Sequence, residues 1–100
     1  MDMSRSKFVF INKCDEVSKL LKSLSHPVRL KVLCQIKDSD KTVCELAELC
    51  NISQSAMSQF LSRMRAEGII DYKKERTSVY YKISNPKVHE LMQAIYRIYC

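Results

Sequence analysis

The fold of this chain is decided by residues 42–82, which read TVCELAELCNISQSAMSQFLSRMRAEGIIDYKKERTSVYYK. Thr42 and Glu45 have the spacing of a capping box, in which each side chain accepts a hydrogen bond from the other residue's backbone N–H. This pair predicts that a helix begins just after Thr42. Asn51 tolerates the left-handed backbone conformation that ends many helices, so we expect the helix to end there.

A second helix is predicted directly after the first. Ser53 has the side chain of a helix N-cap. The apolar residues that follow recur at the i, i+3, i+4, i+7 spacing of one buried helix face, and they are Met57, Phe60, Leu61 and Met64. The opposite face has hydrogen-bonding side chains and no acidic one. Two short helices joined by a tight turn indicate a helix-turn-helix, whose second helix enters the major groove of DNA.

A basic hairpin is predicted after this motif. Gly68 is suited to end the helix, and residues 69–72 and 79–83 have the composition of two strands. The expected base-contacting side chains are Gln54, Ser55, Ser58, Gln59 and Arg63. The expected phosphate-contacting side chains of the hairpin are Lys73, Lys74, Arg76 and Lys82. The alternative for the helix face is that its polar side chains are only solvated, and the sequence does not sort base contacts from phosphate contacts.

The rest of the chain predicts three further helices. One begins at Asn12 or Lys13, with an apolar stripe formed by Cys14, Val17, Leu21 and Leu24. The next begins at Pro27, and the last runs from Pro86 to the end, because proline is tolerated in a first turn. The predicted fold is therefore mainly α with a small β-hairpin: a winged helix-turn-helix of five helices and a two-stranded wing. We expect a flexible lead at residues 1–11 and a single DNA-binding and dimerisation domain at 12–100.

Composition agrees with a nucleic-acid partner. The 100 residues include 17 Lys and Arg against 11 Asp and Glu, a net charge of +6, which favours a polyanion. No apolar run reaches the ~18 residues of a membrane span, so we expect a cytoplasmic protein with no membrane partner. The five cysteines are odd in number, which disfavours a standing disulfide framework.

The order of these elements resembles the ArsR/SmtB family of bacterial winged-helix repressors. The matching segments are residues 24–30 (LSHPVRL), 45–47 (ELA), 53–59 (SQSAMSQ) with Leu61 and Arg65, and 79–81 (VYY). The resemblance implies a homodimer, joined through its first and last helices, that leaves double-stranded operator DNA when an effector acts. The chain departs from the family in the wing, where Glu75 and Arg76 stand at a position that is often glycine. We therefore expect a longer turn.

Sensor residues indicate the branch of the family. Metal-sensing members carry either a cysteine cluster at the start of the helix before the DNA-reading helix, or several His, Asp and Glu ligands across the final helices. At the first location this chain has Cys44 alone, and in its last helix it has His89 and Glu90. These residues do not supply the four ligands that zinc takes, so no metal or cofactor is expected. Two segments that end in cysteine, residues 29–34 (RLKVLC) and 96–100 (YRIYC), resemble those of the persulfide- and redox-sensing dithiol branch of the family (BigR/SqrR/HlyU-like). The two cysteines are Cys34 and Cys100. The resemblance implies that these two cysteines approach each other and that bridging them releases DNA.

The same sequence also fits alternative interpretations. Cys34 could be a small core residue, since free cysteine is often buried, and Cys14 and Cys50 are expected to pack. The whole protein could be a constitutive DNA-binding or anti-silencing regulator with incidental cysteines, or a metal-responsive repressor. An enzyme is not expected, because the sequence has no Cys-x-x-Cys pair and no βαβ pattern.

Overall fold

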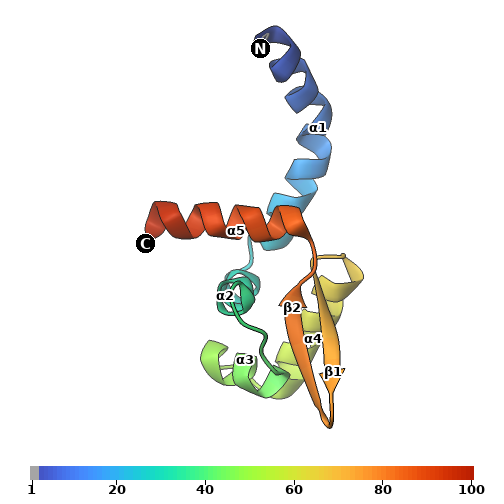
Figure 1. The fold of residues 1–100 in the computed structure, drawn as a ribbon, viewed down its shortest axis with the longest axis vertical. Helices are drawn as coiled ribbons and strands as arrows, with labels where there is room; N and C mark the ends of the chain where they lie inside the picture. Colours follow the sequence, from blue (N-terminus) through green and yellow to red (C-terminus); the bar gives the residue numbers. More distant parts are fainter. Residues whose placement is uncertain (1–2) are drawn as a thin grey trace.

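The computed structural model describes residues 3–100, with side chains from residue 6 onward. Figure 1 shows five helices and one antiparallel hairpin, which confirms the predicted winged helix-turn-helix. Their bounds are α1 Met3–Leu24, α2 Pro27–Ile36, α3 Val43–Cys50, α4 Gln54–Ala66, β1 Ile70–Glu75, β2 Ser78–Ile83 and α5 Pro86–Tyr99.

The caps that define the helix-turn-helix are confirmed. The Glu45 N–H donates to the Thr42 hydroxyl over 3.2 Å, and the Thr42 N–H donates to the Glu45 carboxylate over 3.4 Å. Asn51 ends α3 in the left-handed region with φ 55°, and Ser53 caps α4 by accepting from the Ala56 N–H. A helix N-cap contributes about 1 kcal/mol, so these short-range contacts fix the boundaries of two short helices.

The core lies where α2, α3 and α4 meet the hairpin and the first half of α5. Met57, Leu61 and Met64 of α4 are fully buried, as the spacing predicted, whereas Phe60 is half-buried and its ring lies 4.9 Å from that of His26. The other fully or nearly fully buried side chains are Leu24, Val32, Leu33, Ile36, Leu46, Ala47, Cys50, Ile69, Ile70, Val88 and Met92. Truncating a buried Leu or Met to Ala lowers the free energy of unfolding by about 2–5 kcal/mol. This cluster therefore holds α4 in place, and we call α4 the reading helix because it is the second helix of the helix-turn-helix.

The first helix differs from the prediction. It begins at Met3, so the start expected at Asn12 or Lys13 is wrong. Residues 3–11 form the outer turns of α1 rather than a separate lead, and Met1 and Asp2 lie outside the described residues. The apolar run at residues 8–11 is continuous rather than periodic, so it carries no helical signature.

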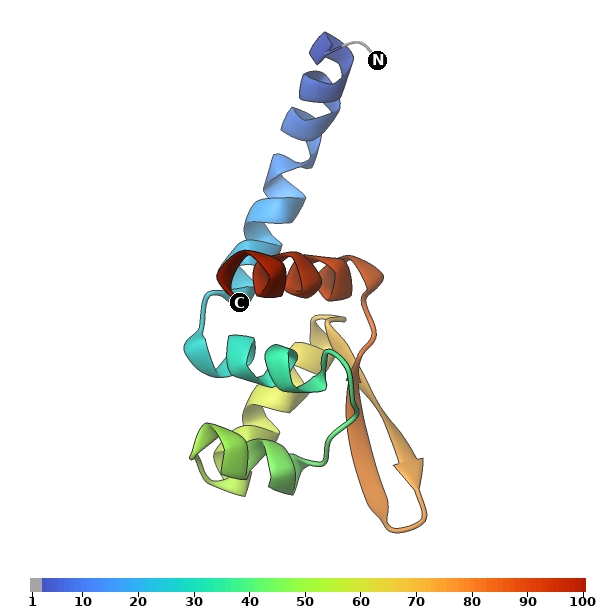
Figure 2. The same cartoon turned by 60° about the vertical axis from the view of Figure 1, so that its left-hand side comes forward.

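The buried stripe of α1 is also different from the expected one. Leu24 is buried and Leu20 packs against the core, whereas Cys14 and Leu21 are exposed. The reason is that only the last turns of α1 reach the core, so the helix contacts it along a shorter face than the sequence suggested. Its outer half extends away from the rest of the molecule, as Figures 1 and 2 both show.

The wing is tighter than expected. Its strands pair from Ile70 with Ile83 to Glu75 with Ser78, so Arg76 and Thr77 alone form the turn and the longer turn predicted there is wrong. Arg76 adopts φ +56°, the conformation that glycine usually supplies in two-residue hairpin turns. Lys73 and Lys74 consequently lie within β1 rather than in the turn.

A short bridge joins the hairpin to the segment before α3. The Tyr81 N–H donates to the Lys41 carbonyl over 2.8 Å, and the Lys41 N–H donates back over 3.3 Å. This pairing fixes the wing relative to the start of the helix-turn-helix. The wing and α3 lie at the end of the molecule remote from the amino end of α1 (Figures 1 and 2). None of the helices within residues 3–100 has the length and apolar character needed to cross a membrane.

Candidate nucleic-acid interface and thiol site

The predicted base-contacting side chains all lie on the exposed side of α4. Its opposite side is buried in the core and packs against α3 and β1, so the polar side faces outward. The exposed side chains are Gln54, Ser55, Ser58, Gln59, Ser62 and Arg63. Small hydroxyls, amides and one guanidinium are the groups that pair with base edges in the major groove.

Both ends of α4 are held by side-chain contacts. At its start, the Gln54 Nε2 donates to the Cys44 Sγ of α3 over 3.3 Å. At its end, the Glu67 carboxylate accepts from the Arg29 guanidinium over 2.6 Å and from the Ser23 hydroxyl over 2.9 Å. The second set joins α1 and α2 to α4, and it could not be predicted because its members are far apart along the chain.

The wing carries the cations that the sequence predicted there. Lys73 bonds Asp40 over 3.2 Å and Glu75 over 3.4 Å, and the hydrogen bond to Asp40, followed by the charge of Glu75, raises the pKa of Lys73. Lys74, Arg76 and Lys82 are exposed, and none of them has an ion-pair partner within the described part of the chain. These three cations are therefore better placed than Lys73 to bind phosphate.

A contact between α4 and the wing was not predicted from the sequence. The Arg65 guanidinium donates to the Asp71 carboxylate over 3.1 Å and lies 4.1 Å from the centre of the Tyr72 ring. The Tyr72 backbone N–H donates to the same carboxylate, and this bond, together with Arg65, lowers the pKa of Asp71. The helix and the strand are thereby linked across the turn at Gly68, a geometry that no periodic pattern encodes.

Cys34 and Cys100, the predicted sensor pair, line one groove between α2 and α5. The groove has a volume of about 260 Å³. Its other lining residues are mostly apolar, and they are Leu30, Lys31, Lys37, Met92, Ile95, Tyr96 and Tyr99. Both thiols are free and exposed, so the alternative of a buried Cys34 in the core is wrong. The fold therefore brings together two cysteines from elements far apart in the sequence.

The end of α2 is tied to α5 beside this groove. The Lys37 ammonium lies 4.5 Å from the centre of the Tyr96 ring and 2.6 Å from the Asp38 carboxylate, and the bond to Asp38 raises the pKa of Lys37. His89 is half-buried, with its Nε2 2.9 Å from the Lys37 carbonyl. This carbonyl at the end of α2 gives the imidazole of α5 a hydrogen-bond partner on another helix.

The remaining cysteines differ in their surroundings. Cys50 is buried as expected, and burial raises the pKa of its thiol. Cys14 is exposed on α1, so the expectation that it packs is wrong, and Cys44 is exposed at the start of α3. Within residues 6–100, no three side chains among His, Cys, Asp and Glu come together in a way that could hold a metal ion.

Comparisons with known proteins agree with this geometry. The family described as "Bacterial regulatory protein, arsR family" matches residues 26–72. The chain is 35% identical to the biofilm growth-associated repressor of Xylella fastidiosa over 88 residues, which are 88% of this chain and 77% of that protein. It is 36% identical to the transcriptional activator HlyU of Vibrio cholerae over 81 residues, 81% of this chain and 75% of that protein.

A solved structure gives the same result in three dimensions. Reduced HlyU from Vibrio cholerae N16961 superposes with a TM-score of 0.84 at 32% identity, covering 91% of this chain and 96% of that one. The family resemblance and its BigR/HlyU-like branch are thus confirmed. The exposed reading helix, the cationic wing and these relatives agree: the chain belongs to the arsR family of bacterial regulatory proteins, as a winged-helix, DNA-binding transcription regulator rather than an enzyme.

Proposed function

We propose that this protein is a homodimeric repressor that releases operator DNA when reactive sulfur or an oxidant bridges Cys34 and Cys100. The observation that carries the proposal is their common groove between α2 and α5. Both thiols are exposed and unbridged, so a small oxidant in solvent has access to them. A bridge would join the last helix to the second helix, and α2 adjoins the helix-turn-helix through the core.

An organic trisulfide R–S–S–S–R can donate the sulfur that bridges Cys34 and Cys100. The Cys34 thiolate attacks the central sulfur and expels one RS⁻; the Cys100 thiolate then attacks that same sulfur and expels the second RS⁻. The two protons that the cysteines release convert both leaving groups to R–SH. The product holds one additional sulfur between the two Sγ atoms, and it spans a wider gap than a disulfide, whose Cα atoms lie within ~7 Å.

Two apolar surfaces support the proposed homodimer. The outer part of α1 exposes Phe8, Val9, Phe10 and Ile11, and the end of α5 exposes Tyr96, Ile98 and Tyr99. Exposed apolar side chains in such number are typical of protein interfaces. Two reading helices in a dimer must match half-sites ~34 Å apart, so a bridge that shifts α5 would disturb simultaneous docking.

We assign base contacts to Gln54, Ser55, Ser58, Gln59 and Arg63. We assign phosphate contacts to Lys74, Arg76 and Lys82, with a smaller share for Lys73 because Asp40 and Glu75 already neutralise part of its charge. This division makes the reading helix responsible for site preference and the wing responsible for affinity that depends on salt concentration.

The proposal is tested by measuring DNA affinity before and after exposure to an organic trisulfide. The proteins are the wild type, Cys34→Ser, Cys100→Ser and the control Cys14→Ser, whose thiol is exposed on α1 away from the groove. A coupling of ~1–3 kcal/mol predicts that the wild type and the control lose affinity about 5- to 150-fold, while the other two variants keep it. Intact-mass spectrometry identifies the bridge.

Two results would reject the proposal. If either groove variant still releases DNA on exposure, the sensor lies elsewhere. If the protein binds the operator equally whether Cys34 and Cys100 are reduced, joined by a disulfide or joined by a trisulfide, it is a constitutive regulator. Because one relative is described as the transcriptional activator HlyU, transcriptional activation is the second candidate function. Measuring transcription from the operator-linked promoter distinguishes activation from repression.

A further inference from the structure

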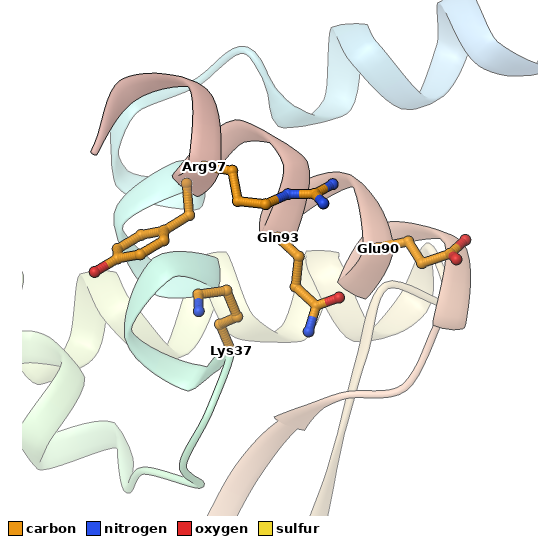
Figure 3. Close-up of a pocket in the computed structure, with 5 residues that line it drawn as sticks. Lys37, Glu90, Gln93 and Arg97 are labelled. Carbon is orange, nitrogen blue, oxygen red and sulfur yellow. The ribbon is translucent and has the colours of Figure 1, made fainter.

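The second helix, α2, contacts the thiol groove at one end and the reading helix at the other. Its last turn contains Cys34, which lines the groove against α5. Figure 3 shows Lys37, directly after α2, facing the side chains of α5, and its ammonium lies 4.5 Å from the centre of the Tyr96 ring. Figures 1 and 2 both show α2 between α5 and the helix-turn-helix. The helix therefore connects the groove to the elements that bind DNA.

The opposite end of α2 is joined to the reading helix by two side-chain contacts. The Arg29 guanidinium, in the first turn of α2, donates to the Glu67 carboxylate and to the Ser23 hydroxyl, each over 2.6 Å. The Ser23 hydroxyl donates in turn to the same carboxylate over 2.9 Å. His26, the N-cap of α2, adds a second contact, because its ring lies 4.9 Å from that of Phe60 in α4.

Glu67 is attached to the last turn of the reading helix. It directly follows α4, and its backbone N–H donates to the Arg63 and Arg65 carbonyls. A displacement of its carboxylate is therefore passed on to the turn that contains Arg63, a proposed base contact. Apolar contacts in the core also join α2 to α4, but they are not directional, whereas a charge-assisted hydrogen bond has a preferred geometry. The Arg29–Glu67 contact can thus fix the angle between the two helices.

We propose that Arg29 and Glu67 are positioning residues that transmit a movement of α2 to the reading helix. The inference rests on the proposed sensor function and adds how the bridge weakens DNA binding. Arg29 lies about 7.5 Å along the helix from Cys34, so both move with α2 as one rigid element. When a bridge to α5 shifts α2, Arg29 pulls Glu67 and the end of α4 out of the orientation that binds DNA. Without this contact, α4 returns to that orientation even in the bridged protein.

The alternative is transmission through α3. This helix packs directly against α2 and precedes the reading helix in the helix-turn-helix. A shift transmitted through these packed backbones would move α3 and α4 together, and it would not depend on the charge of Glu67. Only the proposed mechanism requires the ion pair, so removing the charge distinguishes the two.

The test measures a release ratio, the Kd of the bridged protein for DNA divided by the Kd of the reduced protein. The DNA is a duplex selected from random sequences by the reduced wild type, intact mass verifies the bridge, and fluorescence anisotropy follows binding. Glu67→Gln keeps the shape of the side chain but removes its charge, and at 44% exposure the substitution should not unfold the protein. We expect the release ratio to fall about fivefold, the effect of one charge contact. A merely structural role would change both Kd values by the same factor.

Asp71→Asn is the matched control. Like Glu67, Asp71 accepts a hydrogen bond from an arginine near the end of α4, but it joins the helix to the wing rather than to α2. Its replacement should leave the release ratio at the wild-type value. Arg29→Gln breaks the proposed contact from the other side and should lower the ratio as Glu67→Gln does. The double variant should lower it no further, because both substitutions remove the same contact.

The outcomes separate this inference from the sensor proposal. If bridging leaves the DNA affinity of the wild type unchanged, both are overturned. If the bridged wild type releases DNA and Glu67→Gln keeps the same release ratio, the sensor proposal stands, and transmission through Arg29 and Glu67 is overturned in favour of α3. Transmission through this contact is also overturned if Asp71→Asn lowers the ratio as much as Glu67→Gln, because any loosening of the end of α4 would then have the same effect.

Discussion

The Arg29 guanidinium donates to the Glu67 carboxylate over 2.6 Å, and so joins the first turn of α2 to the end of the reading helix α4. Arg29 also donates to the carbonyl and the hydroxyl of Ser23, near the end of α1. Three helices thus meet at one half-buried cation, whose side chain is 12% exposed. This contact joins the end of α4 to α1 and α2.

Replacing Arg29 with Met should destabilise the fold. The substitution keeps a long apolar stem but removes the charge-assisted bonds to Glu67 and Ser23, each of which contributes ~1.5–3 kcal/mol when well formed. Because Glu67 is partly exposed and screened by water, we expect a total loss of about 1–2 kcal/mol. Urea unfolding followed by circular dichroism measures the change.

Lys13→Met is the control for that experiment. Lys13 pairs with Glu16 over 3.5 Å, with both side chains 60% exposed. An exposed pair contributes at most ~1 kcal/mol, so this variant should unfold close to the wild type. Equal destabilisation by the two substitutions would show that Arg29 has no special role.

Arg76→Gly should separate stability from DNA affinity in the wing. Arg76 holds φ +56°, which costs a residue with a Cβ roughly 1 kcal/mol, whereas glycine adopts it freely. We expect the melting temperature to hold or rise while DNA affinity falls and its dependence on salt becomes shallower, because one phosphate contact is lost. Differential scanning calorimetry and fluorescence anisotropy measure the two effects.

Lys74→Gln provides the comparison on the same hairpin. Lys74 lies within β1 and has no strained backbone, so its loss should lower affinity without raising stability. A parallel change of stability in the two variants would contradict the role given to the left-handed residue.

Gln59→Ala and Lys82→Ala should affect DNA recognition in different ways. Losing the base contact proposed for Gln59 should relax the preference at one base pair by ~1–3 kcal/mol. Losing Lys82 weakens binding to all sequences and reduces the salt slope by about 1. Binding to a set of single-base operator variants over a range of salt concentrations distinguishes them. If Gln59→Ala weakened every sequence equally, that side chain would not contact a base.

Asp71→Asn should reveal a stabilisation that acid removes. The backbone N–H of Tyr72 and the Arg65 guanidinium hold the pKa of Asp71 below its usual range. A lowered folded-state pKa stabilises the fold above the unfolded value of about 4, and this effect is lost as pH falls through the folded value. The stability difference between wild type and variant should therefore be constant near neutral pH and shrink below about pH 4.

Urea unfolding at a series of pH values tests this expectation. A difference that widened on acidification would mean that the carboxylate is repelled, rather than stabilised, by its surroundings in the wing. Asp15→Asn, at an exposed position on α1, serves as the control substitution.

The helix-turn-helix could be predicted from sequence because its signals are local. The capping box at Thr42, the left-handed Asn51 and the stripe through Met57 and Leu61 each act within a few residues. A side chain and the backbone group that it caps remain neighbours in any fold, so the printed sequence specifies these boundaries.

The sequence could not supply the contacts between elements. Arg29 with Glu67, Arg65 with Asp71, and His89 with the Lys37 carbonyl join residues on different elements, and no periodicity marks them. The tight wing turn was mispredicted for a related reason: its length depends on Arg76 accepting a strained backbone, which is decided by the pairing of β1 with β2 along the whole hairpin.

By itself, the sequence determined the order of the elements, the polar face of the reading helix and the cations of the wing. Only the tertiary structure decided that Cys34 and Cys100 share a groove and that α1 extends from Met3. The physical reason is that caps and amphipathic faces arise from short-range contacts along the chain. A groove exists only after the packing of the core has set α2 and α5 beside each other.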